Sequence, residues 1–222
     1  GNEAHVGRGI ERADVPREDV FLATKVWIDR LAYDDVLASV EESLRKLGVD
    51  AVDLLYVHWP AGEYDPAGTL RAFDELVDAG TVDRVGVSNF EPEQVDAAID
   101  RTDAPIFANQ VEVHPLLPQT ELRAHCADRG VEVVAYSPLA RGAVFDVPEI
   151  TEVAAKHGVS EARVSLAWLR EKGVTAIPKA TSEAHVRDNW ASLDLELDSE
   201  DVATIDAIDR TDRRVDPEFA PW

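Results

Sequence analysis

Six short, mostly apolar runs alternate with longer amphipathic segments along the chain, and this alternation constrains the fold more than any other sequence feature. Strands separated by helices at spacings of about 20 to 40 residues predict repeated βα units and a parallel sheet. Strands of this composition are typical of a sheet that is covered on both faces or rolled into a barrel. We predict strands at residues 20–27, 52–59, 84–89, 106–113, 131–137 and 174–179.

The segments between these runs carry helix signals. In residues 34–49, four apolar side chains fall on one helical face, and Gly48 is placed as a C-cap. Residues 149–172 are expected to hold two helices that are broken at Gly158, with Ser160 as an N-cap. Further helices are predicted at residues 69–80, 91–100, 120–130, 182–190 and 199–208.

No Gly-x-Gly-x-x-Gly pattern follows the first predicted strand, which argues against a doubly wound dinucleotide-binding sheet. The remaining α/β architecture is a (β/α)8 TIM barrel. Because only six strands are visible, we expect an incomplete barrel that lacks its first two strands, with two βα units preceding Gly1. No linker or break in composition divides residues 1–222, so we expect a single domain made of strands 3 to 8 and the C-terminal helices.

The charge of the chain is strongly negative, with 22 basic and 44 acidic residues and a net charge of −22. Nucleic acids and anionic membranes require a basic surface, so we expect neither as a partner. An acidic surface with few lysines favours adaptation to high salt over an ordinary acidic cytosolic protein. Without a signal peptide or a membrane-length apolar run, the expected location is the cytoplasm, and the expected state is a monomer or weak oligomer.

Each predicted strand carries a distinctive polar side chain late in its run. Each has an ordinary structural explanation, such as a core histidine, a snorkelling lysine or a helix cap. Six in succession instead favour a ring around one pocket, because active sites of barrels lie at the carboxyl ends of the strands. These residues are Lys25, His58, the pair Ser88 and Asn89, Gln110, the pair Tyr136 and Ser137, and Lys179.

The residue types in this ring limit the reactions that the predicted pocket could catalyse. There is no serine nucleophile motif, and His58 and His114 lie on different predicted strands, so we expect no metal site. A cation beside an imidazole, together with amides and an aromatic ring, suits a site that polarises a carbonyl group. The same set can hold a flat, amide-bearing ligand.

Seven segments in this order resemble the aldo-keto reductase family. They are LATKVW (22–27), DLLYVHWP (53–60), VGVSNF (85–90), NQVEVHP (109–115), AYSPLARG (135–142), IPKAT (177–181) and HVRDN (185–189). The resemblance covers essentially all 222 residues and implies a barrel that reduces aldehydes and ketones to alcohols. It also implies NADP(H) as the cofactor, with NAD(H) used by some members.

By this resemblance, Lys25 matches the family's lysine that lowers the pKa of a catalytic tyrosine, and His58 matches the histidine that orients the carbonyl group. Trp27 and Trp59 would line the substrate pocket. The family's tyrosine and aspartate lie just upstream of a Y-x-N-E pattern, and the tyrosine would be the residue immediately before Gly1. We therefore expect this chain to be a fragment that lacks half the catalytic tetrad and has little or no activity alone.

The resemblance also implies the cofactor contacts. Many family members carry serine and arginine where this chain has Ala180 and His185, so the preference for NADP(H) is expected to be weaker than usual. The implied contacts are Ser88, Asn89 and Gln110 to the nicotinamide carboxamide, Tyr136 stacked on the ring, Ser137 and Leu139 along the pyrophosphate, Lys179 at the 2′-phosphate, and Asp188 and Asn189 at the adenine.

Two other functions remain open from the sequence. The chain could be a non-catalytic module that binds a nicotinamide nucleotide, since the cofactor-contacting residues are present. It could also be a Schiff-base aldolase on the same barrel, with Lys25 as the nucleophile. The physiological carbonyl substrate is not indicated, because loops set the specificity of a barrel.

Overall fold

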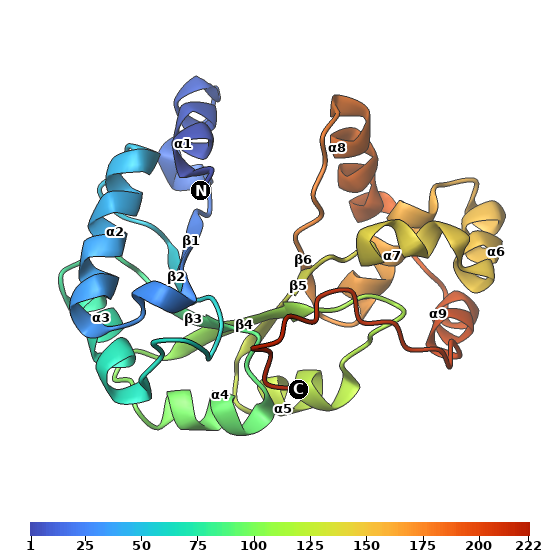
Figure 1. Ribbon diagram of the computed structural model, residues 1–222. Coiled ribbons are helices and arrows are strands. Elements are labelled where there is room, and N and C mark those ends of the chain that lie inside the picture. Colours follow the sequence, from blue (N-terminus) through green and yellow to red (C-terminus); the bar gives the residue numbers. More distant parts are fainter. The chain divides into compact units, whose positions relative to one another are not determined.

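A computed structural model describes all residues 1–222, which divide into two compact units (Figure 1). The first unit is residues 1–109 with 219–222, and the second is residues 110–218. Six strands form one sheet in chain order, from β1 to β6. Strand β4 (Ile106–Glu112) contributes to both units. The α/β class and the parallel sheet are confirmed, whereas the two preceding βα units and the single domain stay predictions.

The first unit holds three short parallel strands that pair in register. They are β1 (Ala23–Val26), β2 (Leu54–Val57) and β3 (Val85–Ser88). Every residue of β2 and β3 is buried, as expected for strands that are covered on both faces. The helices of this unit are α1 (Glu3–Arg12), α2 (Tyr33–Leu47), α3 (Pro66–Asp78) and α4 (Pro92–Ile99).

The predicted helices of this unit form where their caps indicate. Helix α2 ends at Gly48, whose φ of 72° is the left-handed conformation that glycine adopts without strain. Asp65 caps α3 by accepting a hydrogen bond from the Gly68 N–H at 2.9 Å, and Pro66 begins the helix. Helix α1 was not predicted; it contacts α2, and its Gly7 lies so close to Leu47 that a Cβ would be 2.3 Å from the Leu47 oxygen.

The second unit also follows the predicted order. Helices α6 and α7 are separated at Gly158, and the Ser160 hydroxyl accepts a hydrogen bond from the Arg163 N–H, as expected for an N-cap. The predicted strand 174–179 was too long, because only two residues pair with β5 before Pro178, which has no N–H to donate. The elements are α5 (Thr120–Asp128), β5 (Glu132–Tyr136), α6 (Pro148–His157), α7 (Glu161–Glu171), β6 (Thr175–Ala176), α8 (Glu183–Trp190) and α9 (Ser199–Asp206).

The other five strands are also shorter than predicted, each by one to four residues. Strands β1 and β6 are the first and last strands in the order of the sheet. None of the helices combines the length and apolar character needed to cross a membrane.

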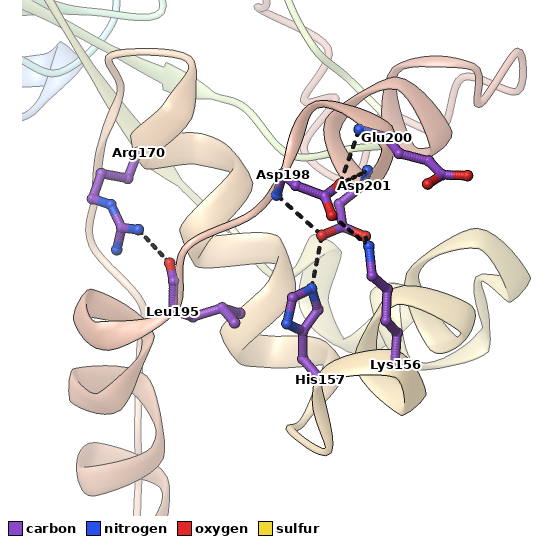
Figure 2. Close-up of polar contacts among 7 residues, drawn as sticks. All are labelled: Lys156, His157, Arg170, Leu195, Asp198, Glu200 and Asp201. Carbon is purple, nitrogen blue, oxygen red and sulfur yellow. Dashed lines mark hydrogen bonds and ion pairs between the residues drawn. The ribbon is translucent and has the colours of Figure 1, made fainter.

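A buried carboxylate joins α6 to α9 (Figure 2). Asp201 is 2% exposed and accepts hydrogen bonds from Lys156 Nζ and His157 Nε2, each at 2.7 Å. It also accepts the Asp198 N–H at 3.1 Å and so completes a capping box at the start of α9. Burial alone would raise the pKa of Asp201, but these hydrogen bonds outweigh it and hold the pKa below its usual value.

We expect Asp201→Asn to lower the free energy of unfolding of this unit by about 2–4 kcal/mol at pH 7, because a buried, charge-assisted network loses its anion. Lys156 is 45% exposed, so water weakens its share of this effect. The folded-state pKa lies below the unfolded value of about 3.9. The contribution is therefore complete above that pH and is lost as the pH falls through the folded-state pKa.

Urea unfolding at neutral and acidic pH measures this effect. Glu200→Gln is the matched control, because Glu200 lies on the same helix and is exposed (Figure 2). The control should change stability by less than about 0.5 kcal/mol. Equal effects of the two substitutions at pH 7 would show that the network does not hold α9.

Candidate active site

Lys25 and His58 come from neighbouring strands of the first unit. Lys25 is the third residue of β1, and its register partner on β2 is Tyr56, two residues before His58. The His58 N–H donates to the Val26 carbonyl at 3.1 Å, so the ladder continues to this residue. Because side chains alternate along a strand, Lys25, Tyr56 and His58 all project from the same face of the sheet.

Lys25 and His58 also line one pocket, with a volume of about 450 Å³. The indole of Trp27 forms part of its wall and meets the imidazole of His58 edge to face, with ring centroids 4.7 Å apart. Residues of α1 and α2, including Glu3 and Glu42, complete the lining. The structure therefore brings together three of the side chains that the sequence predicted for the site.

Burial sets the charge of both central groups. It lowers the pKa of Lys25 to about 8, so the amine is mainly an ammonium at pH 7. Burial, with the Lys25 charge as a second cause, lowers the pKa of His58 to about 4, so the imidazole is neutral. The pocket thus places the Lys25 ammonium beside a neutral ring that can donate a hydrogen bond.

Ser88 and Asn89, at the end of β3, are both buried. Asn89 adopts a positive φ of 63°, which turns the chain out of the strand. Its side-chain amide donates to the His58 carbonyl at 3.0 Å and to the Ser88 hydroxyl at 3.1 Å. Asn89 therefore fixes the backbone of His58, a contact that the sequence did not suggest. The predicted role of this pair toward a nicotinamide stays a prediction.

Trp27 and Trp59 differ in their surroundings. Trp27 is 45% exposed, whereas Trp59 is only 4% exposed. The ring of Trp59 is covered by Phe219 and Trp222, with centroids 5.3 Å and 5.5 Å away, and Phe219 also approaches Trp27 at 6.3 Å. No local sequence signal marks these two aromatic residues, because they are distant in the chain from the tryptophans that they contact.

The second unit carries the remaining predicted cofactor residues. Gln110 is buried on β4, and Tyr136 ends β5 half-buried. Burial raises the pKa of the Tyr136 hydroxyl, and the charge of Glu112 raises it further, so this phenol stays protonated. Ser137 has a positive φ of 47° and opens the loop that contains Leu139. Their predicted contacts with a cofactor are not tested by the structure.

Three further residues were predicted to contact the adenosine part of a cofactor. Lys179 is exposed after β6, and Asn189 lines a pocket of about 490 Å³ together with Ala180. Both carboxylate oxygens of Asp188 already accept hydrogen bonds. One comes from the Ser160 hydroxyl at 2.6 Å and the other from Arg163 Nε at 2.7 Å. Asp188 therefore ties α8 to the start of α7, and any ligand would share it with these donors.

Glu112 is a functional candidate whose contacts the sequence did not reveal. It is 1% exposed, and it accepts hydrogen bonds from His114 Nε2 at 3.1 Å and from the backbone N–H groups of Arg214 and Val215, each at 2.9 Å. Burial alone would raise the pKa of Glu112, but these bonds outweigh it and hold the pKa below its usual value. Glu112 thus anchors the segment that follows α9.

Replacing Glu112 with glutamine should detach this segment, because an amide offers one acceptor oxygen to three donors. We expect a loss of about 2–3 kcal/mol in the free energy of unfolding. Faster hydrogen exchange is expected at the Arg214 and Val215 amides. Glu132→Gln on β5 is the control, since Glu132 is exposed. Unchanged exchange at both amides would contradict the anchoring role.

Comparison with known proteins identifies the family. The sequence model of the Aldo/keto reductase family matches residues 1–210. The glyoxal reductase of Bacillus subtilis is 39% identical over 97% of this chain and 78% of its own length.

Two crystal structures are also similar. An aldo-keto reductase enzyme from a Medee basin deep-sea metagenome library has a TM-score of 0.94 and 32% identity, over 99% of this chain and 81% of its own. An aldo-keto reductase complexed with NADPH has a TM-score of 0.89 and 34% identity, over 97% of this chain and 73% of its own. The resemblance read from the seven segments is confirmed, and the chain belongs to the aldo/keto reductase family.

Proposed function

We propose that this chain serves the NADPH-dependent reduction of small aldehydes and ketones to alcohols, with Lys25 and His58 acting on the carbonyl oxygen. The observation that carries the proposal is the pocket where an ammonium and a neutral imidazole lie together. The similarity to a glyoxal reductase supports a carbonyl substrate. The similarity to a reductase complexed with NADPH supports the cofactor, with NADH as the alternative.

The cofactor, when bound, would supply a hydride to the carbonyl carbon. The proton that completes the alcohol would come from the family's catalytic tyrosine, which the resemblance places immediately before Gly1 and whose pKa the Lys25 ammonium would lower. A carbonyl oxygen held in the pocket would accept a hydrogen bond from the His58 imidazole and lie in the field of the Lys25 ammonium. Both interactions strengthen as negative charge grows on the oxygen, so they stabilise the transition state more than the substrate. The edge-to-face contact with Trp27 holds the imidazole plane while this happens.

The side chains present fit the chemistry of a nicotinamide nucleotide. Ser88 and Asn89 at the end of β3 and Gln110 within β4 are buried hydroxyl and amide groups, which is the donor and acceptor set that a carboxamide needs. The half-buried ring of Tyr136 offers a flat face for stacking. The groups proposed for the remainder of the nucleotide are Ser137, Leu139, Lys179, Asp188 and Asn189.

The charge on Lys25 predicts a pH dependence. Because the pKa of Lys25 is about 8 and the ammonium is the active form, kcat/KM should fall as the pH rises through about 8. His58, with a pKa of about 4, stays neutral between pH 5 and 7, so no loss is expected there. Steady-state oxidation of NADPH with an aldehyde across this range measures the profile.

Lys25→Met should lower kcat/KM by about 100- to 1,000-fold and abolish the fall near pH 8. Lys172→Met is the matched control, because Lys172 pairs with Asp206 in the second unit and plays no part in the proposed chemistry. A profile that keeps its alkaline limb in the Lys25→Met variant would contradict the assignment.

We predict that residues 1–222 alone show little or no reductase activity. It rests on the tetrad tyrosine and aspartate, which have no counterpart at matching positions in these residues. Assays should compare this chain with the same chain extended by about 45–55 N-terminal residues, roughly two βα units. We expect turnover only from the extended chain, which is then the form used for the kinetic variants. Equal turnover of both chains would refute the expectation.

Two alternative functions, a Schiff-base aldolase and a non-catalytic nucleotide-binding module, can each be distinguished from the reductase by experiment. The lowered pKa of Lys25 also suits a Schiff-base aldolase, and borohydride trapping of a Lys25 adduct with an aldehyde would favour that function. A non-catalytic nucleotide-binding module would quench tryptophan fluorescence on titration with NADPH yet show no turnover in either form of the chain.

A further inference from the structure

Four aromatic rings of the first unit form a chain of contacts beside the pocket. The Phe219 ring lies between two indoles, with its centroid 5.3 Å from that of Trp59 and 6.3 Å from that of Trp27. The Trp27 indole in turn meets the His58 imidazole at 4.7 Å. Because Trp59 follows His58 directly in the sequence, the chain of rings starts and ends at neighbouring residues.

The three contacts share one geometry. The interplanar angle is 86° between His58 and Trp27, 86° between Trp27 and Phe219, and 88° between Phe219 and Trp59. Aromatic pairs favour this edge-to-face arrangement, because the positive edge of one ring meets the negative face of the other. A ring in such a pair cannot turn without losing the contact, so each ring restricts the orientation of the next.

Burial fixes one end of this chain of rings. Trp59 is buried, whereas Trp27 and Phe219 are both exposed. Exposed side chains change rotamer readily when nothing packs against them. Phe219 therefore ties the exposed indole of Trp27 to the buried indole of Trp59.

We propose that Phe219 is a positioning residue of the pocket, whose ring holds Trp27 against the His58 imidazole and so keeps that imidazole oriented toward the carbonyl oxygen. The importance of Phe219 for reduction rests on the function proposed above, whereas the ring contacts do not. This role requires no contact between Phe219 and the substrate, because Phe219 acts through Trp27. Phe219 was not among the predicted site residues, since it is distant from His58 in the sequence.

The pKa of His58 reports the position of Trp27. Burial lowers this pKa to about 4, with the charge of Lys25 as a second cause, and the Trp27 indole is one of the groups that cover the imidazole. An indole that moves away admits water and lets the pKa of His58 rise toward its usual value of about 6.5. The charged and titratable groups that line the pocket with His58 are the Gly1 amine, Glu3, Lys25, Arg30, Glu42 and Lys46.

Phe219→Leu tests the role kinetically, because leucine keeps an apolar side chain but removes the ring. In the extended chain, we expect kcat with a small aldehyde to fall about 3- to 10-fold while KM is unchanged, since the transition state gains most from an oriented imidazole. Phe219→Tyr should restore kcat, because it keeps the ring. Phe21→Leu is the matched control and should leave kcat unchanged: Phe21 is a phenylalanine of the same unit that packs on Phe107, with centroids 6.2 Å apart.

A double-mutant cycle distinguishes action through Trp27 from direct contact with the substrate. If Phe219 acts through Trp27, the Trp27→Leu variant and the variant that carries both Trp27→Leu and Phe219→Leu should have the same kcat. Two effects that multiply would overturn the proposal. A Phe219→Leu variant that changes only KM would also overturn it, because that result marks a substrate contact.

NMR titration of the imidazole signals gives a second measurement. The chain has six histidines, so the His58 signal can be followed in the 222-residue chain and assigned with His58→Gln. We expect the pKa of His58 to rise by about 0.5 to 1 in the Phe219→Leu variant. Phe219→Tyr and Phe21→Leu should leave this pKa unchanged. An unchanged pKa in Phe219→Leu, or an equal rise in Phe21→Leu, would contradict the positioning role.

The titration also separates this proposal from the proposed function, because it needs neither substrate nor cofactor. A rise in the pKa of His58 without reductase turnover would support the contacts of Phe219 and count against the reductase. Turnover with an unchanged pKa in Phe219→Leu would do the reverse.

Discussion

The parallel register between β1 and β2 is the constraint on which the rest of the site depends. It places Lys25 beside Tyr56. Because His58 comes two residues after Tyr56, its side chain lies on the same face of the sheet. A slip of one residue would turn one strand's side chains to the opposite face and separate the ammonium from the imidazole. The register is held because Val26, Leu55 and Val57 are buried on the other face, where no polar residue could replace them without cost.

Local signals were enough to predict most of the architecture. Gly48 and Gly158 ended helices because each adopts a positive φ that other residues reach only with strain, and Ser160 began a helix by accepting a backbone N–H. Helix α1 was missed, because glycines at positions 7 and 9 weaken its helix signal. Helix α1 is held by its close packing against α2. This contact joins two separate segments, so the helix propensity of residues 3–12 does not reveal it.

The sequence predicted those site residues that lie at the carboxyl ends of strands. Alternation and parallel pairing place Lys25 and His58 on the same face of the sheet, where they line one pocket with Trp27. Contacts between distant segments were not predictable, as the three donors to Glu112 and the two to Asp188 show. Salt adaptation, a cytoplasmic location and the oligomeric state depend on solvent, cell compartment and other molecules rather than on the fold of one chain, so they stay predictions.

The aromatic cover of Trp59 has a consequence for biosynthesis. Phe219 and Trp222 supply that cover, yet they leave the ribosome long after the strand that precedes Trp59. During this interval a large indole that is 4% exposed in the finished fold remains open to water and to other nascent chains. The first unit can therefore cover Trp59 only after translation has passed through residues 110–218 of the second unit, so this indole stays exposed through most of synthesis.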